Sequence, residues 1–255
     1  MLGSKKRTRT ERPVKTAWSV LLLSLVLVVS LAQEDGELSK EELAALLVGV
    51  EASEIADSPV PGLYEVAIGS NIAYVTADGR YLLQGDLYDL STNENVTESR
   101  RARERVNMLA GVDTADMIIF SPEPEDVKYT VTIFTDIDCG YCRQFHSEIA
   151  KVNEMGIEVH YLFYPRTGPD TDSWFKADMV WCAGAEARNS ALTLAKLGGQ
   201  IPDKACDSSP VSDHYALGQL VGVRGTPAMF SESGEQLGGY LPPAELLERL
   251  NDSSD

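Results

Sequence analysis

The pair Cys139 and Cys142, placed directly after an apolar run, constrains the fold more than any other feature of this sequence. The run Tyr129–Thr135 is rich in β-branched and aromatic residues, which predicts a strand. Residues 142–152 have apolar side chains at helical spacing, which predicts a helix that starts at the cysteines. A strand that leads into Cys-x-x-Cys at the start of a helix is typical of a redox-active site.

This arrangement suits thiol–disulfide exchange. One turn of helix brings the two sulfur atoms within bonding distance. The sulfur of Cys139 faces the unpaired N–H groups and the positive end of the helix, both of which favour its thiolate. The thiolate is the form of cysteine that attacks disulfides. The sequence therefore predicts disulfide chemistry at Cys139 and Cys142.

Two other uses of the cysteine pair have less support. A zinc site needs two further ligands, and only His146 lies at a suitable spacing, so no metal site is expected. An inert disulfide between Cys139 and Cys142 would close a very short loop and stabilise the fold little. His146 is expected on a helix surface, His160 in a strand and His214 in a packed position. None of the three is expected to take part in catalysis.

Residues 1–32 resemble an export signal. Six basic residues precede the uncharged, apolar segment 17–32, and Ser30-Leu31-Ala32 fits a cleavage site before Gln33. This segment is shorter than the roughly 20 residues that a membrane-spanning helix needs, so we expect a cleaved signal peptide, with an uncleaved anchor as the alternative. The net charge of −17 disfavours binding to nucleic acid or to anionic lipid.

All four cysteines lie after this segment, and in an oxidising compartment an even number of cysteines predicts disulfides. Four cysteines allow three pairings. The pairing that best fits the spacing joins Cys139 to Cys142 and Cys182 to Cys206. In the chain-entropy model the second bridge would stabilise the fold by roughly 3–4 kcal/mol, so we expect it to be structural.

The rest of the chain divides into three parts. Residues 37–90 contain a capping box at Ser39 and short strand patterns, which predict a small α+β unit whose sheet edges favour a dimer. Residues 91–112 are polar and charge-rich, which predicts an exposed linker helix. Residues 113–251 predict strand, helix, strand, a helical insertion near 173–197, a strand hairpin and a final helix. That is the thioredoxin order of elements with an insertion.

The segment Phe-Thr-Asp-Ile-Asp-Cys-Gly-Tyr-Cys at 134–142 resembles the periplasmic disulfide isomerases called DsbC. Other segments that resemble this family are Tyr-Leu-Phe-Tyr-Pro-Arg at 161–166, Trp-Cys at 181–182, Asp-His-Tyr-Ala-Leu-Gly at 213–218, Gly-Thr-Pro-Ala at 225–228 and Tyr-Leu-Leu-Gln-Gly-Asp-Leu-Tyr-Asp at 81–89. The resemblance covers nearly all of residues 37–250. An ordered set of this kind is far more specific than a bare Cys-x-x-Cys.

The resemblance implies an α+β fold in which a cystatin-like dimerisation domain and a linker helix precede a thioredoxin-like catalytic domain. It implies that Cys139 is the attacking thiolate and Cys142 the resolving thiol, with Gly140 and Tyr141 as neighbours of the redox site. Thr226-Pro227 would be the turn that faces these sulfurs and receives the substrate chain. The sequence leaves open whether this bond is cis, because only about 5–6% of X–Pro bonds in folded proteins are.

The function implied is a periplasmic, homodimeric isomerase and reductase that rearranges wrong disulfides in misfolded exported proteins. Its electron donor would be a membrane reductase of the DsbD type, and no cofactor is expected. Two alternatives remain: a monomeric thiol oxidase of the DsbA kind, which the extra N-terminal domain and Gly140-Tyr141 disfavour, and a holdase chaperone whose cysteines are secondary. Asp138 is expected to cap the helix; the alternative is that it faces Cys139 and raises the pKa of that thiol.

Overall fold

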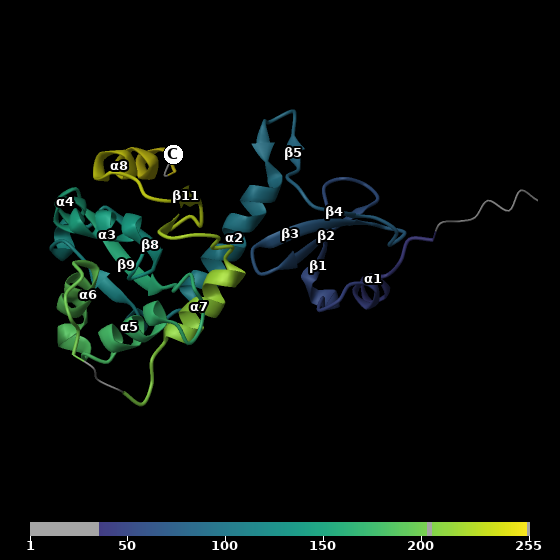
Figure 1. Ribbon diagram of the computed structural model, residues 1–255. Coiled ribbons are helices and arrows are strands. Elements are labelled where there is room, and N and C mark those ends of the chain that lie inside the picture. Colours follow the sequence, from purple (N-terminus) through teal and green to yellow (C-terminus); the bar gives the residue numbers. More distant parts are fainter. Residues whose placement is uncertain (1–35, 203–205, 254–255) are drawn as a thin grey trace, which may run out of the picture. The chain divides into compact units, whose positions relative to one another are not determined.

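The computed structural model describes residues 36–202 and 206–253 (Figure 1). The expected signal peptide, residues 1–32, lies outside the described residues. Within the described ranges no helix is long and apolar enough to cross a membrane.

The N-terminal part is a four-stranded antiparallel sheet with one helix against it (Figure 1). Helix α1 (Lys40–Leu46) begins with the expected capping box, in which the side chains of Ser39 and Glu42 each bond to the other's backbone N–H. Leu43 is fully buried against the sheet and holds the helix there. The strands, in their order across the sheet, are β1 (Ile55–Asp57), β2 (Leu63–Ile68), β3 (Asn71–Thr76) and β4 (Leu82–Leu83).

The linker helix is shorter than expected. Residues 91–112 were predicted to be helical, but helix α2 spans Val96–Ala110 because the Asn95 side chain accepts a hydrogen bond from Glu98 N and caps it. A short ladder of β5 (Tyr88–Asp89) and β6 (Glu94–Asn95) precedes it. The helix is also less exposed than expected, because Arg105 is buried and donates to the carbonyl oxygens of Val221 and Gly234.

The C-terminal part is built on a five-stranded sheet in the order β11-β10-β8-β9-β7. The predicted strand Tyr129–Thr135 is confirmed as the central strand β8, which pairs in parallel with β9 and antiparallel with β10. The other strands are β7 (Ile118–Phe120), β9 (Ile157–Phe163), β10 (Ala228–Ser231) and β11 (Gln236–Gly238).

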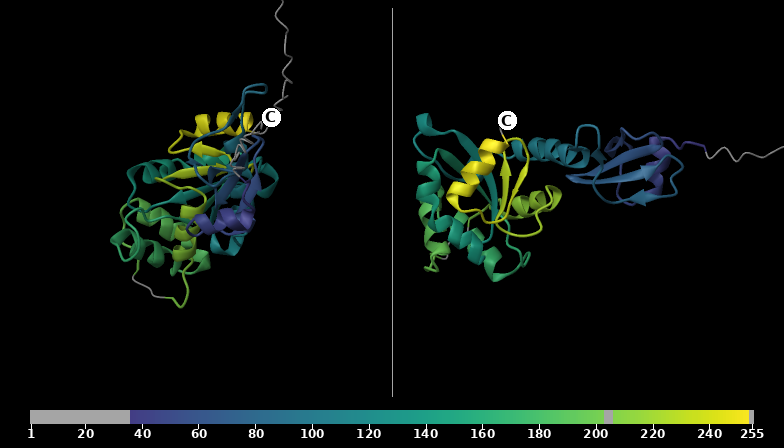
Figure 2. Two further views of the ribbon diagram at one scale, coloured as in Figure 1. Left: turned by 90° about the vertical axis from the view of Figure 1, so that its right-hand side faces the viewer. Right: turned by 90° about the horizontal axis from the view of Figure 1, so that it is seen from above.

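Both faces of this sheet are covered. Ile133 belongs to a large apolar cluster with α3, α5, α6 and α8, whereas the next residue, Phe134, packs on the opposite face with Tyr164 and Phe230. Figure 2 shows α8 beside β11. The helices are α3 (Gly140–Ser147), α4 (Ile149–Glu154), α5 (Asp172–Trp181), α6 (Arg188–Lys196), α7 (Val211–Leu220) and α8 (Pro243–Asp252). Short 3₁₀ helices are Ala52–Glu54, Thr114–Asp116, Pro124–Asp126 and Ala185–Ala187.

Two predicted helices are each divided in two. The helix expected over 142–152 leaves helical geometry at Glu148, which separates α3 from α4. The insertion expected near 173–197 is divided between α5 and α6, and Gly184 there has a φ of 98°, a left-handed value that a residue with a side chain rarely adopts. The chain therefore turns between α5 and α6, and both helices pack on the same cluster.

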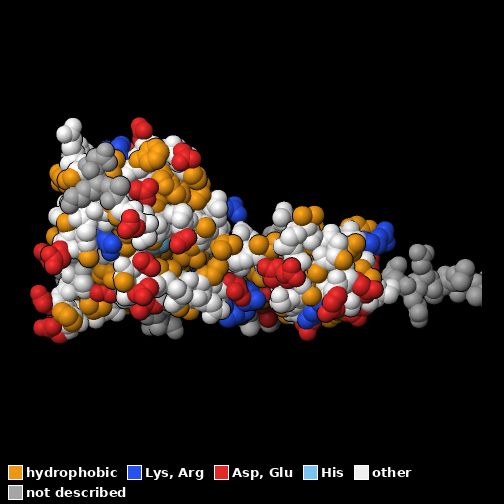
Figure 3. All heavy atoms as spheres, turned by 90° about the horizontal axis from the view of Figure 1, so that it is seen from below, with side chains coloured by type: hydrophobic (Ala, Val, Ile, Leu, Met, Phe, Trp, Pro, Cys, Tyr) orange, Lys and Arg blue, Asp and Glu red, His pale blue; other side chains and the backbone are white. Residues whose placement is uncertain are grey.

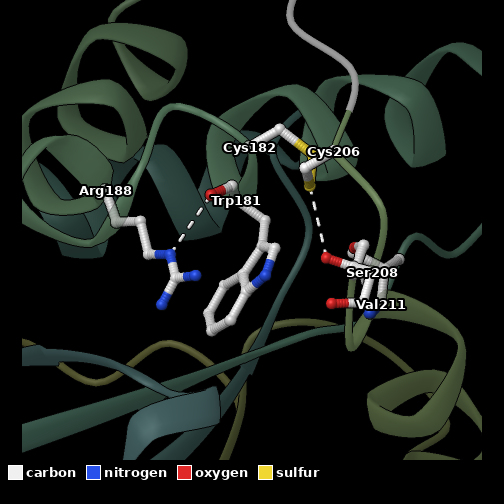
Figure 4. The surroundings of a disulfide bond; sticks show 7 residues. Trp181, Cys182, Arg188, Cys206, Ser208 and Val211 are labelled. Carbon is white, nitrogen blue, oxygen red and sulfur yellow. Dashed lines mark hydrogen bonds between the residues drawn. A yellow bond between two sulfur atoms is a disulfide. The ribbon is translucent and has the colours of Figure 1, made fainter.

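The structure joins Cys182 to Cys206 by a disulfide, as expected (Figure 4), whereas the other expected bond, Cys139–Cys142, is not formed and both thiols are free. The bridge ties the end of α5 to the segment before α7. Trp181 beside it is buried, and the Arg188 Nε atom donates to its carbonyl oxygen at 3.1 Å. Trp174 is partly buried against the same cluster. Trp181 therefore belongs to the packing around the bridge, whereas Trp174, near the start of α5, contacts the ring of Tyr215.

Acidic side chains are scattered over the face of the molecule that Figure 3 draws. On the face drawn in Figure 3, Asp and Glu residues are scattered over both parts of the chain, with Lys and Arg fewer between them. This face presents no continuous basic surface of the kind that binds nucleic acid.

Candidate active site

Cys139 and Cys142 lie where the central strand ends and α3 begins. Strand β8 ends at Thr135, a short turn follows, and Cys139 takes the N-cap position of α3 in an extended conformation. Both thiols are free, and the two residues are only 3% and 1% exposed. The Cys139 Sγ atom donates to the carbonyl oxygen of Thr226 at 3.1 Å. The strand-to-helix arrangement predicted from the sequence is therefore present.

The two thiols have opposite electrostatic environments. Burial by itself raises the pKa of Cys139, but hydrogen bonds from Thr226 and Cys142, together with the charge of Arg166, outweigh it and leave that pKa below its ordinary value. Burial also raises the pKa of Cys142, and there it prevails over the favourable charge of Lys196. Cys139 is therefore the more readily ionised thiol of the pair.

The loop opposite the cysteines is residues 225–227, directly before β10. The Thr226-Pro227 bond is cis, which answers the question that the sequence left open. Since β10 pairs with β8, with Ala228 opposite Phe134, the loop and the cysteines lie at the same end of neighbouring strands. The Thr226 hydroxyl is buried and lies close enough to both thiols to favour their thiolate forms.

The two residues between the cysteines differ in their surroundings. A Cβ atom added to Gly140 would meet no atom within 4 Å, so this position faces open space. Tyr141 is 63% exposed and stacks on Tyr240, with 6.0 Å between the ring centroids. An open position and an exposed aromatic side chain thus border Cys139.

A buried carboxylate anchors the turn between β8 and α3. Asp136 accepts hydrogen bonds from the backbone of Asp138, from the backbone and Nε of Arg166, and from the Ser173 hydroxyl, at 2.5 to 3.0 Å. Burial raises the pKa of Asp136, but these hydrogen bonds outweigh it and hold the pKa below its usual range. The ion pair with Asp136 also holds the Arg166 guanidinium near Cys139.

The expectation that Asp138 caps the helix is wrong. Cys139 is the N-cap residue, and no side chain bonds to the first turn of α3 from that position. The Asp138 carboxylate instead forms ion pairs with Arg143 and Lys176, each at 2.8 Å. Charge-assisted hydrogen bonds to Arg143 and Lys176 stabilise this carboxylate more than the N–H groups of a helix N-terminus would, so the side chain turns to the two cations.

The expectation that His146 lies on a helix surface is also wrong. His146 is 3% exposed, and its two ring nitrogens bond to the hydroxyls of Tyr161 and Thr193 at 3.1 and 2.9 Å. Both nitrogens are thus occupied, which leaves none for a metal ion. His160 lies on β9, and His214 is buried with its Nδ1 atom accepting from Phe163 N, as the sequence predicted for a strand and a packing residue.

Buried His146 predicts a loss of stability in acid. Burial, with the charge of Lys196, lowers its pKa from 6.5 to about 3. Between these values the unfolded chain binds a proton that the folded protein excludes, so stability falls as the pH falls. At pH 5 this amounts to about 2 kcal/mol. We expect the free energy of urea unfolding to differ less between pH 7 and pH 5 in His146→Asn than in the wild type. An equal difference in the two proteins would contradict the lowered pKa of His146.

Sequence reasoning missed one residue beside the site, Lys196. Lys196 ends α6 and is 3% exposed, with its Nζ atom 2.7 Å from the Thr135 hydroxyl oxygen at the end of β8. The signal was present, because Lys196 follows Leu192 by one helical turn and so occupies a position on the apolar face of its helix. A charged residue on the apolar face of a helix is rare, so it indicates a specific role for that side chain.

Comparisons with known proteins find matches to both parts of the chain. A family model described as a thioredoxin-like domain matches residues 123–254, and one described as the disulfide bond isomerase protein N-terminal domain matches residues 30–98. The thiol:disulfide interchange protein DsbC of Escherichia coli (strain K12) is 36% identical over 223 residues, which cover 87% of this chain and 89% of that protein. The protein of the same name from Dickeya dadantii is 37% identical over 235 residues, or 91% and 94% of the two chains. Among solved structures, a disulfide interchange protein from Neisseria gonorrhoeae aligns at 27% identity with a TM-score of 0.48, covering 55% of this chain and 97% of that one.

Proposed function

The chain belongs to the thiol:disulfide interchange protein DsbC family, and we propose that Cys139 and Cys142 are the pair with which it exchanges disulfides. It is a thiol–disulfide isomerase with the α+β fold expected, a thioredoxin-like domain preceded by a disulfide isomerase N-terminal domain. We further propose the boundaries 37–90 for a dimerisation domain, 91–112 for the linker and 113–251 for the catalytic domain.

The observation that carries the assignment of roles is the position of Cys139 at the N-cap of α3, with its sulfur against the Thr226 carbonyl oxygen, whereas Cys142 lies inside the helix. The lowered pKa of Cys139 and the raised pKa of Cys142 agree with these positions. Cys139, with its pKa lowered, attacks a disulfide of a client protein, and the client's other sulfur leaves as a thiolate. That thiolate can attack another disulfide of the client, and the thiolate released there attacks the client sulfur bonded to Cys139, which returns the enzyme reduced. The sum of these steps is isomerisation, with no net change in oxidation.

A second route leaves the client reduced. The Cys142 thiolate attacks the Cys139 sulfur of the mixed disulfide, the client sulfur leaves, and a Cys139–Cys142 disulfide forms. An external dithiol must then reduce the enzyme. We propose that a membrane reductase of the DsbD type supplies these electrons in the periplasm, and that the working form is a homodimer joined through the N-terminal domain. Misfolded exported proteins with wrong disulfides are the clients.

Thr226 and Pro227 complete the proposed site. The Thr226 carbonyl oxygen lies 3.1 Å from the Cys139 sulfur, so a client chain bonded to Cys139 must lie against this loop. The open position at Gly140 and the exposed ring of Tyr141 provide room and apolar contact beside it. The Cys182–Cys206 bridge is proposed to be structural, because it ties the C-terminal end of α5 to the segment before α7.

The test distinguishes an isomerase from an oxidase. The purified, reduced protein is incubated with a client whose disulfides have been scrambled, and in parallel the oxidised protein is incubated with the same client fully reduced. We expect recovery of client activity in the first reaction and only slow oxidation in the second. Rapid oxidation of the reduced client by the oxidised protein, without recovery of the scrambled one, would favour a DsbA-like oxidase and contradict the proposal.

A further inference from the structure

A lysine lies buried beneath the resolving thiol. Lys196 is on the face of α6 that also carries the buried residues Leu192 and Ala195. Its Nζ atom lies 2.7 Å from Thr135 Oγ1 and 3.5 Å from the carbonyl oxygen of Asp136. The helical insertion thus brings a cationic side chain to the end of the central strand, where the chain turns toward the cysteines.

This lysine has no carboxylate partner within ion-pair distance among residues 36–202 and 206–253. The Tyr161 ring, with its centroid 5.8 Å from Nζ, is the nearest aromatic contact. A buried ammonium group without a counter-ion is costly, so it is retained where an anion forms nearby or where the group can lose its proton. The Thr135 hydroxyl connects Lys196 to the thiol of Cys142, which can supply such an anion.

Thr135 lies between the two groups. Its hydroxyl oxygen accepts from Lys196 Nζ, and the same hydroxyl is within hydrogen-bonding reach of the Cys142 sulfur. A hydroxyl can donate one hydrogen bond while it accepts another, so it can pass a proton in either direction. We propose that Lys196, acting through Thr135, takes up the proton of Cys142 and stabilises its thiolate while the mixed disulfide is resolved.

The steps balance, and they rest on the proposed roles of the two cysteines. The Cys142 thiol gives its proton to Thr135, whose own hydroxyl proton passes to the neutral amine of Lys196. The products are a thiolate, an unchanged hydroxyl and an ammonium group. The thiolate then bonds to the Cys139 sulfur, the bond from Cys139 to the client sulfur breaks, and the client leaves with the electron pair. The ammonium group finally releases its proton to water.

The acid–base properties of the site fit this role. Burial lowers the pKa of Lys196 from 10.5 to about 8, while the charge on Cys142 acts in the opposite direction. A neutral amine is therefore accessible near neutral pH, and a thiolate on Cys142 makes the protonated form more favourable. The charges of Asp136 and Cys139 also raise the pKa of Lys196, and the charge of Arg143 lowers it. In turn, the charge of Lys196 lowers the pKa of His146, and the charge of Cys142 raises the pKa of Tyr161.

The test uses dithiobis(nitrobenzoate), with which the two thiols react in two steps that can be observed separately. Attack by Cys139 releases one nitrothiobenzoate and leaves a mixed disulfide; attack by Cys142 on that disulfide releases a second. Both releases are followed by absorbance in stopped flow from pH 6 to 10. We expect Lys196→Met to slow the second release about tenfold at pH 7 and to raise its pH midpoint by about one unit, since one pKa unit changes the thiolate fraction tenfold. The first release should change less than twofold.

Three further variants keep the test decisive. Thr135→Val removes the hydroxyl at nearly constant volume and should slow the second release in the same way. Lys151→Met removes an exposed lysine on α4 and should change neither release. A second release with unchanged rate and pH midpoint in Lys196→Met, or an equal slowing of both releases, would overturn the proposal. If the proposed roles of the cysteines fail instead, the first release will persist unchanged in Cys139→Ala.

Discussion

Replacement of Cys139 by alanine is expected to reduce recovery of a scrambled client by roughly 100-fold or more, down to the uncatalysed rate. Without this thiolate no mixed disulfide can form, and the buried Cys142, with its raised pKa, cannot take its place. The measurement is the rate at which client activity returns, with wild type and variant at equal concentration. The substitution removes one sulfur atom from a small buried residue, so the fold should persist.

The same variant tests the chaperone alternative. A holdase would still suppress aggregation of the client after Cys139 is removed, because holding depends on surface and not on sulfur. We therefore expect suppression of aggregation to be independent of Cys139 and recovery of correct disulfides to require it. Recovery by Cys139→Ala at the wild-type rate would show that the cysteines are secondary.

Replacement of Asp136 by alanine is expected to destabilise the C-terminal part by about 2–3 kcal/mol, because buried donors lose the acceptor of their hydrogen bonds. Asp136 is 2% exposed, and its loss leaves the Ser173 hydroxyl and the Arg166 guanidinium without their acceptor. The measurement is guanidinium unfolding at fixed protein concentration, followed by the fluorescence of Trp174 and Trp181, which both lie in this part.

Asp138→Ala is the matched control. Asp138 lies two residues away and also pairs with two cations, but its side chain is 32% exposed, so we expect a loss of at most about 1 kcal/mol. Removal of Asp136 should also raise the pKa of Cys139, because Arg166 loses the ion pair that holds it near that thiol. Similar destabilisation by the two variants would contradict the view that Asp136 anchors the turn.

The sequence predicted those parts of the fold that depend on local pattern. The alternation and β-branching of Tyr129–Thr135 led to the central strand, and the Ser39 capping box led to α1. Helix ends were less predictable. Residues 142–152 and 173–197 each have continuous helical composition, but the helices divide at Glu148 and at residues 182–187, where packing on the sheet decides the direction of the chain.

The site was predicted less completely than the fold. The cysteines and the Thr226-Pro227 turn carry motifs that can be read along the chain. The roles of Asp136, Lys196 and buried His146 depend on contacts between segments 30 to 61 residues apart, which spacing alone does not reveal. Asp138 shows the reverse error: a local rule predicted a cap, but Lys176, distant in sequence, provides a better partner.

The most direct test of the central claim identifies the sulfur that bonds to the client. In Cys142→Ala the second route is closed, so mixed disulfides with a scrambled client should accumulate and can be trapped with acid. Peptide mapping by mass spectrometry then locates the bond. We predict that the client is joined to Cys139 and that Cys182 and Cys206 remain joined to each other. A client bound to Cys182 or Cys206, or no mixed disulfide at all, would contradict the assignment of Cys139 as the attacking thiol.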